Sequence, residues 1–115
     1  MSFSSSQIAF NPQGNTVVVA ADPTAPLGVQ APAGTVNPRG QYRVVNPSAV
    51  MVHLGVGATA AAAQANAVAA AAGVPAAGIP LVPGAVEILR FSPEAYFSGK
   101  ASEATTVYIT PGEGL

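Results

Sequence analysis

The chain has 115 residues, a formal net charge of −1, 8% charged residues and no cysteine. This length can bury one hydrophobic core but not a two-domain enzyme, and four scattered basic residues cannot form the basic patch that nucleic-acid binding requires. The absence of cysteine excludes disulfides and thiolate metal sites and fits a reducing cytoplasm.

The first forty residues combine short apolar runs with recurrent proline. Gln7 to Phe10 and Thr16 to Ala21 are predicted strands, and the turn-forming residues 11–15 predict a hairpin loop between them. Prolines at positions 23, 26, 32 and 38 suit loops and edge segments and exclude a central strand or a helix. We therefore expect a single β-rich domain over 1–115, in which residues 1–40 include an extended Pro-rich arm.

Two further strands are predicted on either side of a bend at residues 46–48. They run from Tyr42 to Val45 and from Ala49 to Leu54. In the second, Val50, Val52 and Leu54 alternate with Met51 and His53. Since both sets are large, we expect each face of this strand to be partly covered.

Alanine dominates residues 58–72 and predicts a short helix, with Gly73 as its C-terminal cap. An extended or a disordered conformation of this tract stays open as the alternative. The uncharged stretch 67–86 is interrupted by Pro75, Pro80 and Pro83, so no membrane span is expected.

The C-terminal third predicts a meander of strands at Ala85 to Phe91, Tyr96–Phe97 and Thr105 to Thr110. Pro111–Gly112 is the turn signal expected to stop the last strand. Six or seven short strands separated by Pro and Gly turns indicate a mainly β fold. We expect a β-sandwich or jelly-roll-like module with one short alanine-rich helix.

The stretch Gly55-x-Gly57-x-x-Ala60, between a predicted strand and a predicted helix, matches the dinucleotide-binding fingerprint. Glu87 follows 27 residues after Ala60, where about 20 is usual. The rest of the chain is too short for the remaining βαβ units. We therefore interpret the glycines as easing a strand into a turn, and expect no cofactor.

Candidate catalytic groups are few. His53 is the only histidine, so a histidine-based metal cluster is excluded, and a Ser-His-Asp triad would depend on Asp22 or a glutamate. A glutamate pair could hydrolyse glycosides, but seven aromatic residues without tryptophan give little to line a sugar cleft. We interpret His53 as packed at a contact and the glutamates as solvated, and expect no enzymatic activity.

The low proportion of charge predicts contacts with other proteins. A soluble domain has about 25% charged residues, and a net charge of −1 leaves little repulsion between copies. We expect a homo-oligomer, either a dimer or a trimer. Tyr96, Phe97 and Tyr108 suit core pairs and interface anchors equally well. The candidate interface residues are Phe10, Val29, Tyr42, His53, Tyr96, Phe97 and Tyr108.

Two segments are similar to small β-sandwich proteins of tailed-phage virions: "YRVVNPSAVMVHLGVG" at 42–57 and "IPLVPGAVEILRFSPEAYFSGKASEATTVYITPGEGL" at 79–115. The shared pattern is a strand pair, a strand after Pro-x-Gly, an aromatic strand, and a final Val-Tyr-Ile/Val-Thr-x-Gly-x-Gly tip. About half the chain is covered. The first forty residues and residues 58–72 are not.

The resemblance implies a capsid decoration or cement protein, made in the host cytoplasm, that binds the major capsid protein on the outer surface of the virion. The N-terminal arm is then expected to make the capsid contact. Tyr42 to Leu54 and Thr105 to Thr110 are expected to form the core or the self-association surface. Two alternatives stay open: a head-fibre, head-completion or tail adaptor, and a small carbohydrate-binding or enzymatic module.

Overall fold

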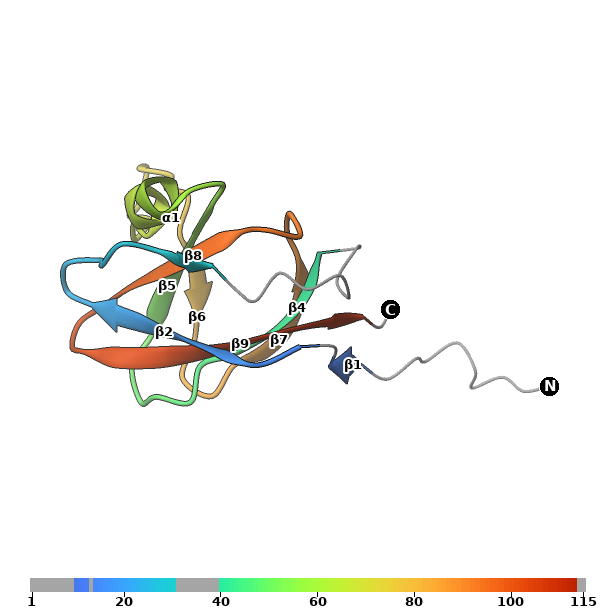
Figure 1. Ribbon diagram of the computed structural model, residues 1–115. Helices are drawn as coiled ribbons and strands as arrows, with labels where there is room; N and C mark the ends of the chain where they lie inside the picture. Colours follow the sequence, from blue (N-terminus) through green and yellow to red (C-terminus); the bar gives the residue numbers. More distant parts are fainter. Residues whose placement is uncertain (1–9, 13, 31–39, 114–115) are drawn as a thin grey trace.

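The structure is a computed structural model in which residues 10–12, 14–30 and 40–113 are described. These residues form a mainly β unit with one short helix, and the strands join in one mixed sheet that curls into a half-barrel (Figure 1). The predicted fold class is confirmed. The elements are β1 (Asn11–Pro12), β2 (Val17–Asp22), β3 (Val29–Gln30), β4 (Gln41–Val45), β5 (Val52–Gly57), α1 (Ala60–Asn66), β6 (Ile79–Leu81), β7 (Val86–Arg90), β8 (Tyr96–Ala101) and β9 (Thr105–Glu113).

The sheet runs in the order β6-β5-β8-β2-β9-β4-β7, with β1 attached to β9 and β3 attached to β8. β9 pairs antiparallel with β2 on one side and with β4 on the other. The one parallel pairing among the described strands joins β2 to β8 through Ala21↔Gly99 and Asp22↔Lys100. The C-terminal strand therefore holds the first and middle parts of the chain together.

The predicted N-terminal hairpin is wrong where it can be compared, although residues 7–9 lie outside the described residues. β1 and β2 both pair antiparallel with β9, through Asn11↔Glu113 and Val17↔Ile109. They therefore follow one another along the same side of β9. Four residues, 13–16, lie between these pairings on the side of β1 and β2, whereas only two residues of β9, 110 and 111, lie opposite them. Such an insertion is a bulge in a strand pair rather than a reversal of the chain.

The sequence predicts that the last strand stops at Pro111–Gly112, but β9 continues to Glu113. Pro111 is buried, pairs with Tyr42 of β4, and lies opposite the interruption between β1 and β2. Gly14 from that interruption lies so close to the proline ring that an added Cβ would be 2.7 Å from Cγ of Pro111. Proline is tolerated in a strand where the ladder is disrupted by a bulge.

The core fills the concave face of the half-barrel. Val52 and Leu54 of β5 are fully buried there, which confirms the predicted alternation, while His53 faces the convex side. An aromatic cluster closes one end: the ring centroids of Tyr42 and Phe97 are 5.2 Å apart, edge to face, and Phe91 packs against both. The Tyr42 hydroxyl donates to the backbone carbonyls of residues 92 and 93.

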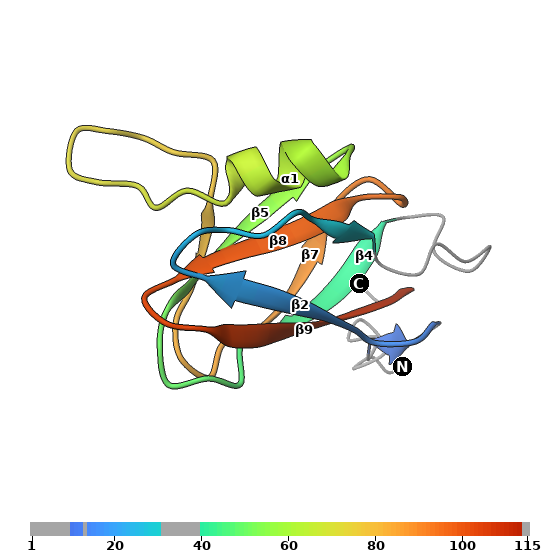
Figure 2. The same cartoon turned by 60° about the vertical axis from the view of Figure 1, so that its left-hand side comes forward.

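α1 is shorter than the alanine tract that predicts it. It begins after Thr59, whose hydroxyl accepts a hydrogen bond from the Ala62 amide, and it ends at Asn66. Asn66 donates its side-chain amide to the Val56 carbonyl. Gly73 is not its cap: with φ of 74° it lies in the turn of the projecting loop that leads to β6 (Figure 2).

Gly55 and Gly57 let α1 lie directly on β5. A Cβ at Gly57 would be 2.6 Å from the Ala63 amide nitrogen, and one at Gly55 would fall on the backbone of Ala63 and Ala67. β5 pairs antiparallel with both β6 and β8. The surroundings are therefore not the parallel βαβ unit of a dinucleotide fold, and the glycines serve helix packing.

Candidate interaction surface

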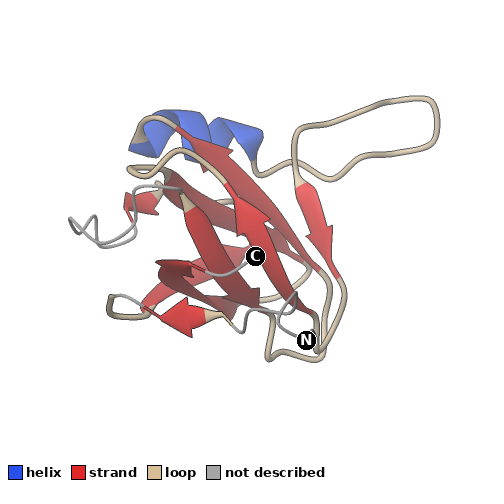
Figure 3. Ribbon diagram, turned by 90° about the vertical axis from the view of Figure 1, so that its right-hand side faces the viewer, coloured by secondary structure: helices blue, strands red, loops and turns tan. Residues whose placement is uncertain are grey.

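The convex face of the sheet has two halves, and described segments of the chain pack over only one of them. One, the covered half, lies over β5 and β8 and carries α1 (Figures 1 and 3). The segment 25–28 closes this cover: the Gly28 amide donates to the Ala60 carbonyl, and the Gln64 side chain donates to the Ala25 carbonyl. Beneath it, the wholly buried Ser98 hydroxyl donates to the Pro26 carbonyl.

The other half, which we call the open half, is the convex face of β2, β9, β4 and β7. Its strand register places Val18 beside Tyr108, Tyr108 beside Val45, and Val45 beside Val86. This row therefore crosses all four strands. Val18 is 54% exposed, Tyr108 41% and Val86 53%, and Ile88 on β7 adds a fifth apolar side chain that is 47% exposed.

Polar side chains border the apolar row on one side. Thr16 and Thr110 share a hydrogen bond of 2.7 Å between their hydroxyls. Arg43 pairs across strands with both Thr110 and Ile88, and Arg90 follows on β7; both arginines are exposed. No ion pair joins them to an acidic side chain among the described residues. An apolar row with a polar and basic rim has the composition of a protein-binding surface.

The sequence-predicted interface residues are scattered rather than gathered in one patch. Tyr108 lies at the centre of the open half, and Val29 is exposed on β3. Phe10, His53 and Tyr96 are half-buried. Tyr42 and Phe97 are wholly buried in the core. Their burial corrects the interface prediction for these two residues, because an aromatic side chain enclosed by its own chain cannot anchor a partner.

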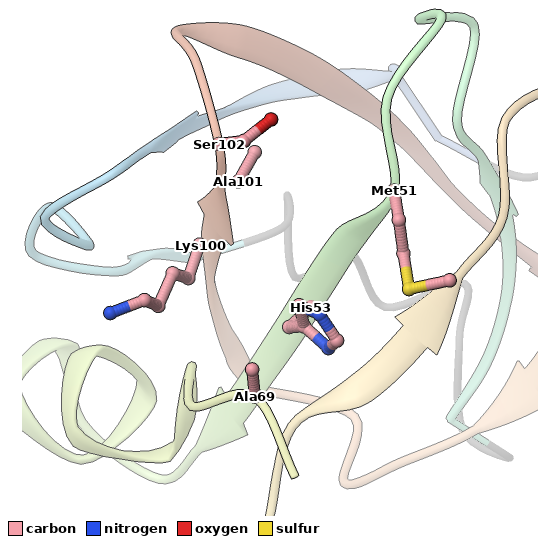
Figure 4. Close-up of a pocket in the computed structure, with 6 residues that line it drawn as sticks. All are labelled: Met51, His53, Ala69, Lys100, Ala101 and Ser102. Atoms are coloured by element: carbon pink, nitrogen blue, oxygen red, sulfur yellow. The ribbon is translucent and has the colours of Figure 1, made fainter. Parts of the chain in front are cut away.

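A shallow hollow of about 280 Å³ lies beside the start of β5 and the end of β8 (Figure 4). His53 and Lys100, which are cross-strand neighbours, face it together with Met51 and Ser102. The Nδ1 atom of His53 is buried and has no hydrogen-bond partner among the described residues. The imidazole is half-buried among the residues that line this hollow.

Four apolar residues of the open half, Val18, Val45, Val86 and Ile88, were not among the predicted site residues. A usable signal was present: Val17-Val18-Val19 and Val44-Val45 place apolar side chains on both faces of a strand. A sheet with one solvated face shows apolar and polar residues in alternation, so apolar residues on both faces indicate that both are covered. Here no described helix or strand lies over the convex side of these strands.

Within the described residues, no three His, Asp or Glu side chains gather where they could hold a metal ion. No helix in this part of the chain is long and apolar enough to cross a membrane. Comparisons with protein-family models, curated proteins and solved structures give no match to this chain.

Proposed function

We propose that this chain is a structural docking module that binds another protein through its open half, and that its partner is the outer surface of a tailed-phage capsid. The observation that carries the docking role is the row of Val18, Tyr108, Val45 and Val86, aligned across four strands. The side chains lie on paired strands, so the surface is held rigid before the partner binds. A preorganised surface loses little conformational entropy on docking.

Tyr108 is the anchor of this surface. It is 41% exposed and has an apolar neighbour on each side, Val18 on β2 and Val45 on β4. Tyrosine is enriched among the residues that dominate binding energy, particularly at the centre of an interface ringed by other contacts. A complementary partner surface would offer an apolar depression for Tyr108 and hydrogen-bond acceptors or carboxylates for Arg43 and Arg90.

The capsid as partner rests on the resemblance of residues 42–57 and 79–115 to small virion β-sandwich proteins. A decoration protein is present in many copies, and its modest individual contacts are multiplied across the shell. The low charge of this chain suits close packing of copies on one surface. A head-fibre, head-completion or tail adaptor would use the same open half in few copies per particle.

Binding to capsid shells that lack this chain tests the proposal. The wild-type chain is expected to sediment with the shells. Tyr108→Lys is expected to weaken binding by about thirtyfold, since losing a hot-spot tyrosine costs about 2 kcal/mol or more. The fold should survive, because the side chain is exposed.

The matched control is Ala61→Lys, an exposed position on α1 over the covered half. It adds the same charge at a place that the proposed interface does not use, so its binding should equal that of the wild type. Equal binding by Tyr108→Lys and wild type, or loss of binding only in Ala61→Lys, would refute docking through the open half.

A further inference from the structure

The sheet ends in two edge strands with very different backbones. β6 spans only Ile79–Leu81 and has Pro80 at its centre. β7 spans Val86–Arg90 and contains neither proline nor glycine. Proline has no N–H to donate, and a short strand offers few backbone groups, so β6 is protected against pairing with another chain. β7 lacks both protections.

The outer edge of β7 has no strand partner among the described residues. β4 pairs with its other edge along the full length of the strand, from Gln41↔Arg90 to Val45↔Val86. The regular pairing shows that β7 is an unbroken strand, as a template for one more strand must be. Five residues supply enough backbone N–H and C=O groups for a short antiparallel ladder.

The apolar row of the open half also reaches this edge. Val86 closes the row, and Ile88 lies two residues along the same strand and on the same face. A strand added here should therefore present apolar side chains at alternate positions on the convex face. β7 itself has that pattern, which makes the edge self-complementary.

We propose that two copies of this chain pair antiparallel through their β7 edges, forming a closed two-fold dimer with a continuous sheet. With Ile88 at the two-fold axis, each Ile88 faces Ile88 of the second copy. Val86 then faces Arg90, and Glu87 faces Leu89. No like charges stand directly opposite one another, which is the arrangement that antiparallel pairs favour.

Because the β6 edge resists pairing and the β7 edge does not, the assembly is limited to two copies of the chain. A head-to-tail filament would require β6 to accept β7, and Pro80 with only three strand residues opposes that pairing. An isologous pair uses both β7 edges and leaves none free. The two open halves then join across the axis into one extended surface. This dimer does not depend on the capsid role and is tested without any capsid.

Single-cysteine cross-linking tests the geometry, because the chain has no cysteine of its own. Residues directly opposite in an antiparallel pair have Cβ atoms about 4.5–5.5 Å apart, near the separation of a disulfide. Under mild oxidation Ile88→Cys is expected to become mostly covalent dimer. Val18→Cys is the matched control: it lies at the other end of the row, with 54% exposure against 47% for Ile88, and should form no disulfide between copies.

The oligomeric state provides the second readout, by light scattering after size-exclusion chromatography. The wild type should show twice the chain mass of 11.3 kDa. Ile88→Lys sets two like charges face to face and should raise the dissociation constant at least tenfold, whereas Val18→Lys should remain dimeric. Should Ile88→Lys fail to fold by circular dichroism, the two cysteine variants decide the question alone.

Three results would overturn the dimer. One is a wild type that stays monomeric at high concentration, which would leave β7 free for a strand of a different protein. The others are equal cross-linking of the two cysteine variants and an oligomer that Ile88→Lys leaves intact. A confirmed dimer in which Tyr108→Lys still binds shells normally would support this inference while refuting the proposed docking surface.

Discussion

The two halves of the convex face differ in what packs over them. Over β5 and β8 the strands carry Gly55, Gly57 and Ser98, and the chain lays its own helix on them. Over β2, β9, β4 and β7 the outward side chains include a row of exposed Val, Tyr and Ile bordered by Thr and Arg, and no described element lies on them.

Residue size explains the difference. A helix can approach a strand closely only where the strand has no bulky side chain, so glycine is required under α1. Large apolar side chains project from the sheet and lose contact with water only when something else packs over them. Small outward residues therefore mark a face that the chain covers itself, and large apolar ones mark a face suited to a partner.

Substituting Gly55 should disrupt the packing of α1 on the covered half. We expect this substitution to lower the free energy of unfolding the most. Gly55→Val places a branched side chain where even one Cβ would collide with the backbone of Ala63 and Ala67. Forcing extra volume into packed structure costs about 1–3 kcal/mol, and we expect the upper end here because backbone cannot yield as a side chain can. The shift of the urea unfolding midpoint measures the loss.

Ala61→Val on the exposed side of α1 is the control for Gly55→Val, since it adds a similar side chain where nothing is packed. Its free energy of unfolding should change by less than about 0.5 kcal/mol. If both variants unfolded at the same urea concentration as the wild type, α1 would not be seated on β5 as described.

A smaller effect is expected for Ser98→Ala, which sharpens the same comparison. The variant removes the hydrogen bond from the buried hydroxyl to the Pro26 carbonyl and so loosens the segment 25–28 that flanks α1. A hydrogen bond of this kind contributes about 1 kcal/mol, measurable by chemical denaturation. The exposed Ser102→Ala should leave stability unchanged. A loss of equal size in both would show that the covering segment contributes nothing.

Local sequence patterns were sufficient to predict much of the fold. The alternation of Val52, His53 and Leu54 correctly predicts which side chains enter the core, and the alanine tract correctly predicts a helix. Pairing between distant segments was not predictable in this way. Asn11 to Asn15 have the composition of a hairpin turn, yet β1 and β2 both pair with β9, which lies 84 to 102 residues later in these pairs.

The candidate surface was predictable only in part, for a similar reason. Tyr108 was identified from its residue type, but type alone also suggested Tyr42 and Phe97, which are in the core. What distinguishes them is the face of the sheet on which each lies. The row itself depends on the register of β9 against β2 and β4, which aligns Val18, Tyr108 and Val45. No short stretch of sequence contains that register.

Hydroxyl-radical labelling of the chain, free and bound on virions, tests the central claim most directly. Tyr108 on the open half and Met51 beside the hollow are each 41% exposed, so each residue serves as the reference for the other. We predict that binding lowers the labelling of Tyr108 several-fold and leaves Met51 unchanged. Unchanged labelling of Tyr108, with Met51 protected instead, would contradict docking through the open half and place the contact at the hollow.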